Sequence, residues 1–168
     1  MHFKIESNNI GLRPAYPDEV DYIYELEARP ENSQYVMAYS RDRHLQVIES
    51  HDEELLIIVD RSNGQPLGFV ILAGLANPNL SLEFRRLIVG DKGKGIGRHA
   101  VKLVIQYCFK TLRFHRLWLD VYEDNHKAIH LYQSTGFKQE GMLRDVIKHA
   151  NTYRSLLLFS ILEEEATQ

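Results

Sequence analysis

Residues Leu82 to Gly97 read LEFRRLIVGDKGKGIG and are the most informative segment of the sequence. Its first half, up to Val89, is rich in apolar residues and predicts a β-strand. Gly90 and Asp91 interrupt that pattern, and glycines then alternate with other residues at Gly93, Gly95 and Gly97. Further on, apolar residues recur at helical intervals of three and four, at Val101, Val104, Ile105, Cys108 and Phe109. The stretch therefore predicts a strand, a glycine-rich loop and the first turn of a helix.

This order of elements favours a binding site for phosphate groups. The first turn of a helix leaves backbone N–H groups without partners and carries a partial positive charge. Glycines let an anion approach these amides, and Lys92, Lys94 and Arg98 add positive charge beside them. The alternative is a glycine-rich turn that only connects a strand to a helix.

Two known phosphate-binding loops do not match. The dinucleotide pattern Gly-x-Gly-x-x-Gly has Ala100 at its third glycine position when it is started at Gly95. A Walker loop needs a serine or threonine after Gly-Lys, and here Gly93-Lys94 is followed by Gly95.

Length and composition limit the kind of protein. The 168 residues suit one domain, residues 1–168, and a net charge of -3 gives no overall attraction to nucleic acid or to an anionic membrane. We therefore expect neither partner. Cys108 is the only cysteine, which fits a reducing cytoplasm and a role in the core. The eight histidines are scattered, so we expect no metal site.

The remaining pattern predicts an α/β (α+β) fold. Strands are expected at residues 10–14, 55–60, 66–75, 80–89, 116–122, 137–148 and 153–162. Helices are expected to begin near Pro17, Ser40, Gly97 and Asn125. Short turns make most neighbouring strands antiparallel, and the long helical connection after Val89 makes one pair parallel. The polar tail after Leu162 is expected to fray.

Two separated motifs resemble those of the GCN5-related N-acetyltransferases. The family pattern Arg/Gln-x-x-Gly-x-Gly/Ala maps onto Lys92, Gly95 and Gly97, with lysine in place of the usual first residue. The pattern Asn-x-x-Ala-x-x-x-Tyr-x-x-x-Gly-Phe maps fully onto residues 125–137. The order of elements agrees over nearly the whole chain, and bacterial members that acetylate polyamines or protein N-termini look most similar. This resemblance implies a mixed, mostly antiparallel sheet of six to seven strands, about four flanking helices and a splayed parallel strand pair.

The resemblance also implies that acetyl-CoA is the co-substrate, bound where the two parallel strands separate. Backbone groups of the strand end would pair with the pantetheine arm, and amides of the glycine loop would hold the pyrophosphate. The implied binding residues are Leu87, Ile88, Val89, Lys92, Gly93, Lys94, Gly95, Ile96, Gly97, Arg98, Asn125 and Tyr132. Asn125 is equally suited to cap the helix that follows it.

Catalytic roles follow from the same resemblance. Tyr132 would protonate the leaving CoA thiolate, since a phenol with a pKa of about 10 is protonated at neutral pH; the alternative is a tyrosine of the core. The general base would be Glu83 or Asp120, acting directly or through a water. Glu83 could instead pair with Arg85 or Arg13, and Asp120 could be an ordinary strand residue.

The resemblance thus implies an acetyl-CoA-dependent N-acetyltransferase that transfers the acetyl group directly to a primary amine. The acceptor would be a small amine such as a polyamine, or a peptide or protein N-terminus. A non-catalytic, acyl-CoA-binding regulatory domain is the alternative, and a nucleotide-binding module ranks below it because it leaves the second motif unexplained. Family members often pair through their C-terminal strands, so a homodimer is also expected.

Overall fold

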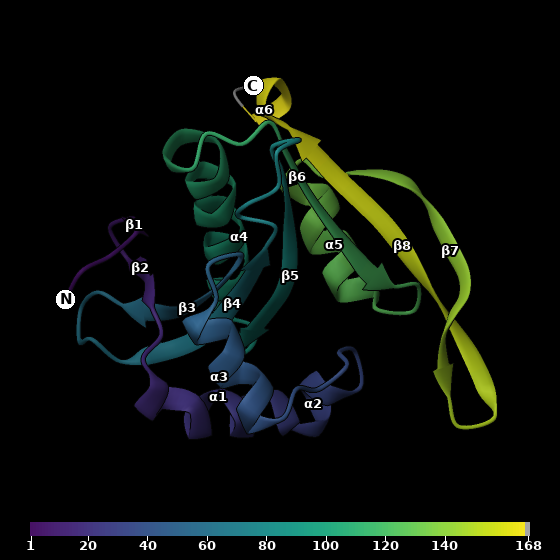
Figure 1. The fold of residues 1–168 in the computed structure, drawn as a ribbon, viewed down its shortest axis with the longest axis horizontal. Helices are drawn as coiled ribbons and strands as arrows, with labels where there is room; N and C mark the ends of the chain where they lie inside the picture. The colour runs from purple at the N-terminus through teal and green to yellow at the C-terminus, as the bar shows by residue number, and fades with distance from the viewer. Residues whose placement is uncertain (167–168) are drawn as a thin grey trace.

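An open sheet of eight strands runs through residues 1–166, the part of the chain that this computed structural model describes (Figure 1). The strands are β1 (Ile5–Glu6), β2 (Ile10–Pro14), β3 (Glu53–Asp60), β4 (Pro66–Ala73), β5 (Ser81–Val89), β6 (Arg116–Tyr122), β7 (Lys138–His149) and β8 (Thr152–Leu162). The helices are α1 (Val20–Ala28), α2 (Pro30–Ser33), α3 (Arg41–Glu49), α4 (Ile96–Gln106), α5 (His126–Ser134) and α6 (Glu163–Ala166). The strand order is β1-β2-β3-β4-β5-β6-β8-β7.

One parallel pair interrupts an otherwise antiparallel sheet. The strands β5 and β6 pair only at Ser81 with Arg116, Leu82 with Leu117, and Glu83 with Trp118. Beyond these residues β5 continues against β4, and β6 continues against β8. The two strands therefore separate toward their C-terminal ends, and the predicted splayed pair is confirmed.

A β-bulge lies in β5 just beyond the last of these pairs. Phe84 is opposite Leu72 of β4, whereas Arg86 is opposite Ile71, so Arg85 is an extra residue on β5. An extra residue changes which face the following side chains occupy. Phe84 consequently packs in one core of the protein, and Ile88 packs in the other.

Two hydrophobic cores lie on the two faces of the sheet. One face packs against α4 and α5 through residues that include Val101, Val104 and Tyr132. The other packs against α1 and α3, where Ile23, Leu26 and Val47 are buried. Figure 1 shows the helices α1, α2 and α3 gathered at one end of the molecule, away from α4 and α5.

The structure differs from the sequence-based prediction in its short elements. It adds β1, a strand of two residues, so the described part has eight strands rather than six or seven. Four of the helices have nine to eleven residues, as expected, and α2 and α6 have four residues each. The tail that was expected to fray begins with α6, and its last two residues lie outside the described part.

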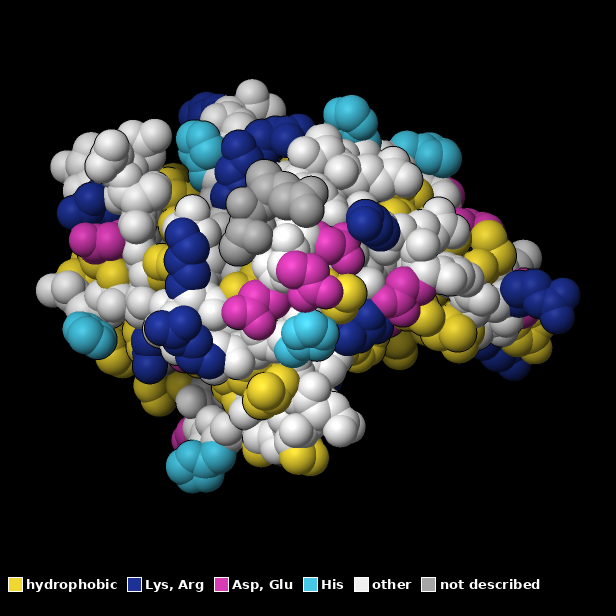
Figure 2. All heavy atoms as spheres, turned by 90° about the horizontal axis from the view of Figure 1, so that it is seen from above, with side chains coloured by type: hydrophobic (Ala, Val, Ile, Leu, Met, Phe, Trp, Pro, Cys, Tyr) yellow, Lys and Arg dark blue, Asp and Glu magenta, His cyan; other side chains and the backbone are white. Residues whose placement is uncertain are grey.

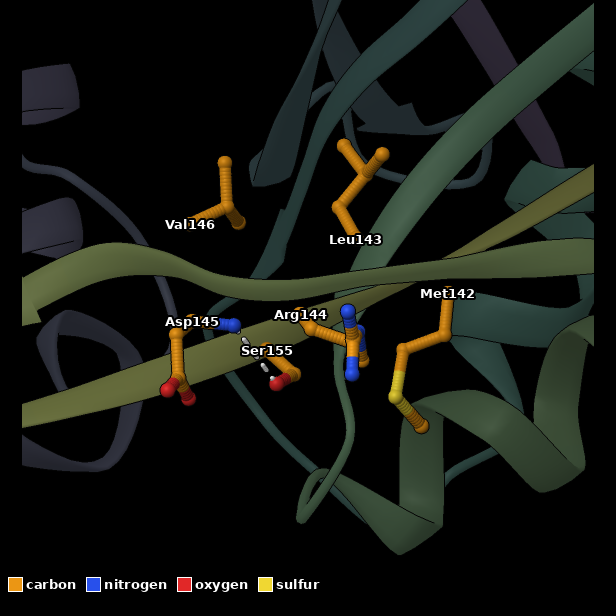
Figure 3. A pocket seen from close by; sticks show the side chains of 6 residues that line it. All are labelled: Met142, Leu143, Arg144, Asp145, Val146 and Ser155. Atoms are coloured by element: carbon orange, nitrogen blue, oxygen red, sulfur yellow. Dashed lines mark hydrogen bonds between the residues drawn. The ribbon is translucent and has the colours of Figure 1, made fainter.

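The long hairpin of β7 and β8 extends away from the rest of the molecule (Figure 1). Four large apolar side chains on it are exposed: Met142, Leu143, Val146 and Tyr153. Between Leu143 and Ile147 the pairing with β8 is interrupted, and the Asp145 N–H donates to the Ser155 hydroxyl at 3.0 Å. Figure 3 shows Leu143 and Val146 on one side of β7, with Met142, Arg144 and Asp145 on the other. Basic, acidic and histidine side chains are mixed on the face drawn in Figure 2.

Candidate active site

A cleft of about 650 Å³ opens where β5 and β6 separate. Its walls come from α2 and the segment after it, the C-terminal half of β5, the loop before α4, the end of β6 and the first turns of α5. Most of the residues predicted to bind acetyl-CoA line this one cleft: Leu87, Ile88, Val89, Lys92, Gly93, Gly95, Ile96, Gly97, Asn125 and Tyr132.

The glycine loop has a backbone that suits an anion. Gly93 has φ 84° and Gly95 has φ 75°, both in the left-handed region that side chains disfavour. A Cβ built on either glycine would have no heavy atom within 4 Å, so this side of the loop is open. Gly95 is the N-cap of α4. Within residues 1–166, the N–H groups of residues 91–98 donate no hydrogen bond, so they are available to phosphate oxygens. The loop therefore fits the pyrophosphate of acetyl-CoA.

The three predicted cationic side chains of this loop lie differently. Lys92 lines the cleft, and its Nζ lies 3.4 Å from the Val89 carbonyl oxygen. Partial desolvation by the surrounding protein, with the positive charges of Lys127 and Arg29, lowers the Lys92 pKa, although the negative charge of Glu31 opposes the change. Lys94 and Arg98 are not among the lining residues, and the exposed Lys94 instead pairs with Asp91 at 3.1 Å.

Tyr132 lies in α5 with its ring buried beneath the cleft. The ring makes edge contacts with Phe84 and Phe137, at centroid distances of 6.1 and 5.6 Å. Its hydroxyl forms no hydrogen bond within residues 1–166. Burial, assisted by the negative charge of Asp120, raises the Tyr132 pKa above its ordinary value. The phenol is therefore protonated throughout the physiological pH range.

The two candidate bases have different surroundings. Asp120 lines the cleft, and its carboxylate makes no hydrogen bond or ion pair within residues 1–166. Desolvation by the surrounding protein and, to a smaller extent, the negative charge of Glu83 raise the Asp120 pKa. The positive charges of Arg85 and Arg86 oppose this change. Glu83 is not among the lining residues, and its carboxylate pairs with the Arg85 Nε at 3.1 Å. The structure therefore brings Asp120 and Tyr132 together in the lining of the cleft and leaves Glu83 out of that lining.

Asn125 occupies the start of α5. Its side-chain oxygen accepts a hydrogen bond from the Ala128 N–H at 3.4 Å, as expected of an N-cap residue. The residue also lines the cleft. The cap uses the oxygen, and the side-chain NH₂ group is left to donate.

Several residues at the cleft were not predicted. Gln34, Tyr35 and Val36 line one wall, and Arg86 lines the floor. The guanidinium of Arg154 donates to the Gln34 carbonyl at 2.9 Å and to Asp124 at 2.6 Å, so it joins two walls. The sequence contained one sign that Arg86 is unusual, because this residue interrupts the alternation of apolar residues in β5.

Residues 1–166 contain no group of three histidine, cysteine, aspartate or glutamate side chains placed to hold a metal ion. None of the helices in this part of the chain has the length and apolar character needed to cross a membrane.

The sequence and the fold match known acetyltransferases. A sequence model of the acetyltransferase (GNAT) family matches residues 20–137. Spermidine N(1)-acetyltransferase of Escherichia coli strain K12 is 27% identical over 174 residues, covering 95% of this chain and 89% of the relative. Spermine/spermidine N(1)-acetyltransferase of Bacillus subtilis is 38% identical over 69 residues, covering 40% of this chain and 45% of the relative.

A solved structure shows the same fold. Spermidine N-acetyltransferase from Vibrio cholerae, crystallised in complex with CoA and spermine, superposes with a TM-score of 0.85 at 25% identity. The match covers 96% of this chain and 100% of that one. The chain therefore belongs to the acetyltransferase (GNAT) family and is an N-acetyltransferase that uses acetyl-CoA.

Proposed function

We propose that this enzyme acetylates a primary amine of a polyamine, with Asp120 as the general base and Tyr132 as the general acid. The observation that carries the proposal is the meeting of a free carboxylate, a protonated phenol and a phosphate-binding loop in one cleft. The names of the relatives support the acceptor class, since the E. coli and V. cholerae proteins are spermidine acetyltransferases.

Part of the cleft lining suits a cationic acceptor. Glu31 and Asp120 line the cleft, and their carboxylates would attract the ammonium groups of a polyamine. Asp124 also lines it but is paired with Arg154. Other acidic residues near α1 and α3 serve the fold instead. Glu27 is buried against Arg86, and Glu53 pairs with Arg43 at 2.8 Å.

Asp120 has the properties required of the base. Only a neutral amine can attack a thioester, and a primary amine is mostly protonated near neutral pH. A carboxylate without other hydrogen bonds can accept the proton of the ammonium group, directly or through a water. A raised pKa makes Asp120 a better proton acceptor than an ordinary aspartate. Glu83, held by Arg85, strengthens this effect through its negative charge.

Tyr132 completes the proton transfers. When the bond between the acetyl group and sulfur breaks, the thiolate needs a proton, and the Tyr132 hydroxyl supplies it. No acyl-enzyme on cysteine is needed. Cys108 is fully buried in the π-helical segment Tyr107–Thr111 that follows α4. Burial, together with the negative charge of Glu163, raises the Cys108 pKa to about 12. A thiol in that state does not act as a nucleophile.

Acetyl-CoA would be held by the remaining cleft residues. The backbone edge of Leu87, Ile88 and Val89 faces the opening between β5 and β6 and is suited to pair with an extended pantetheine arm. Amides from Lys92 to Gly97 would bind the pyrophosphate, with Lys92 adding charge. Lys94 and Arg98 would act only at longer range, and the Asn125 NH₂ group would donate to the pantetheine region.

Two further parts of the proposal concern the setting of the enzyme. The edge strand β7 carries exposed Met142, Leu143 and Val146, which is the kind of surface that a second copy would cover in a homodimer. Light scattering of the purified protein tests this, and a monomer at micromolar concentration would refute it. The lone buried thiol fits a cytoplasmic location.

A direct test of the activity uses acetyl-CoA with separate amines: spermidine, spermine and a peptide with a free N-terminus. Thiol release should be fast with a polyamine and slow with the peptide. Turnover of the peptide but of neither polyamine would refute the polyamine acceptor and assign a peptide N-terminus as the acceptor. Binding of acetyl-CoA without turnover of any amine would favour the non-catalytic regulatory domain.

A further inference from the structure

A buried ion pair lies beneath the cleft and joins α1 to β5. The Glu27 carboxylate accepts a hydrogen bond from the Arg86 guanidinium at 2.7 Å, and the two side chains are 1% and 6% exposed. Burial raises the Glu27 pKa, but the hydrogen bond with His44 and the charge of Arg86 outweigh it and lower the pKa overall. Glu27 is therefore a carboxylate at neutral pH.

Stability alone is a weak reason for such a pair. Removing two charges from water costs several kcal/mol per ion, and an apolar pair of similar volume often stabilises a protein as well. The pair also depends on the bulge at Arg85, which turns Arg86 toward α1 instead of toward the core beneath α4. The groups that Glu27 and Arg86 hold in place therefore indicate the role of the pair.

The pair holds the backbone of the chain between α2 and α3. The Tyr39 N–H donates to Glu27 at 2.7 Å, and Arg86 donates to the Met37 carbonyl oxygen at 3.0 Å. The Arg86 guanidinium also lies 4.3 Å from the centre of the Tyr39 ring. His44, from α3, lies 3.1 Å from the same carboxylate. One buried pair thus fixes both sides of the turn that leads into α3.

Other contacts to this part of the chain are few. No residue from Ser33 to Ser40 is fully buried, and Met37 is 62% exposed. Val36 and Tyr39 pack partly against the second core, and Arg154 donates to the Gln34 carbonyl. The first three residues after α2, Gln34, Tyr35 and Val36, line the cleft, and we name them the acceptor wall. Since the packing of the acceptor wall is only partial and Arg154 holds its first residue, the position of its other end depends on the polar contacts made just beyond it, at Met37 and Tyr39.

We propose that Glu27 and Arg86 are positioning residues that set the acceptor wall and thereby the affinity for the amine. The inference rests on the proposed function, because it takes the amine to bind beside this wall. Arginine is required because its planar fork donates to Glu27 and to Met37 at the same time, whereas lysine presents a single ammonium. The Arg86 side chain does not touch reacting atoms in this scheme.

Steady-state kinetics of Arg86→Lys test the proposal. We expect the KM for spermidine to rise by about tenfold or more, since small displacements of a binding wall are costly, while the KM for acetyl-CoA stays within about twofold. Arg116→Lys is the matched control: Arg116 pairs with Glu140 away from the cleft, so its kinetic constants should not change. An unchanged spermidine KM in Arg86→Lys would overturn the proposal.

Hydrogen exchange of the unliganded enzyme gives a second test that needs no acceptor. In the wild type, the Tyr39 amide should exchange at least about a hundredfold more slowly than an open loop, because Glu27 holds it. Arg86→Lys should speed exchange across residues 34–40 and leave β3 and β4 unchanged. Exchange of Tyr39 at the rate of an open loop in the wild type would overturn the proposal, even if the variant fails to fold. Failure of every amine to react would instead refute the proposed acceptor and leave this test intact.

Discussion

Glu83 and Trp118 are the last residues that pair β5 with β6. The bulge at Arg85 follows at once on β5, and Asp120 follows two residues later on β6. The opening for the substrates and the position of a candidate base are therefore set by the same interruption of the sheet. Because the strands keep their other partners, the gap is held open by a rigid frame.

The glycine loop supplies the first prediction. Gly95→Ala should destabilise the protein by about 1–2 kcal/mol, because Gly95 has φ 75° and a Cβ is unfavourable there. It should also weaken the binding of acetyl-CoA, measured by calorimetric titration. Gly97→Ala is the control. Gly97 lies inside α4, and a Cβ there would meet the Leu131 side chain at an ordinary contact distance of 3.6 Å. The stability of the protein should therefore stay the same or rise, and the binding of acetyl-CoA should persist. Equal losses in the two variants would contradict the assigned loop geometry.

Tyr132→Phe separates catalysis from packing. The Tyr132 hydroxyl has no hydrogen-bond partner within residues 1–166, so its removal should change the free energy of unfolding by less than about 0.5 kcal/mol. The kcat should nevertheless fall by about 10²–10⁴-fold.

Tyr107→Phe should give the reverse result. The Tyr107 hydroxyl donates to Glu54 at 2.9 Å, far from the cleft residues, so the variant should lose about 1–3 kcal/mol of stability and keep its kcat. If Tyr132→Phe retained full kcat, Tyr132 would be a core residue and another group would protonate the thiolate.

Asp120→Asn and Glu83→Gln distinguish the two candidate bases. We expect kcat/KM to fall by about 10²–10⁴-fold in Asp120→Asn, because the amine then loses its proton acceptor. Glu83→Gln should cost less than about tenfold, since Glu83 acts only through its charge on Asp120. The opposite order of effects would assign the base to Glu83, acting through a water, and would refute the role given to Asp120.

The pH dependence of kcat/KM should show which group limits each side. Asp120 is a base, so activity is lost as the pH falls through its pKa, and this limb should lie above the ordinary carboxyl value of about 3.9. Tyr132 acts as an acid and its pKa is raised, so kcat/KM should not fall with rising pH until the pH exceeds about 10. A stopped assay of acetylated product across pH 5 to about 10 checks both limbs. A decline between about pH 8 and 9 would exclude Tyr132 as the acid.

The sequence predicts most of the fold and the phosphate-binding side of the cleft. The glycine loop, the strand before it and the helix after it are local patterns, and local patterns can be read without the structure. The helix start near Ser40 and the cap at Asn125 are confirmed for the same reason. The surroundings of Asp120 were not predictable, because they depend on how β6 pairs with distant strands. The pairing of Glu83 with Arg85, two residues along the same strand, was one of the expected alternatives.

The bulge at Arg85 explains why the position of Arg86 was not predicted. Strict alternation along β5 puts Arg86 on the same face as Phe84, and the extra residue at Arg85 moves it to the opposite face, against Glu27. The sequence shows only that Arg86 interrupts the apolar alternation, and that interruption does not by itself distinguish a bulge from a polar residue facing the core. The contact between Glu27 and Arg86 spans 59 positions, so it becomes visible only in the folded chain.

The central claim is direct acetyl transfer to a polyamine, and the most direct measurement is a mass balance in a single turnover. Equimolar enzyme, acetyl-CoA and spermidine are mixed, and the small molecules and the intact protein are both analysed by mass spectrometry. We predict one acetylspermidine for each thiol released and an enzyme whose mass never includes an acetyl group. Thiol release without acetylspermidine, or an acetylated enzyme that forms before the product, would contradict the account.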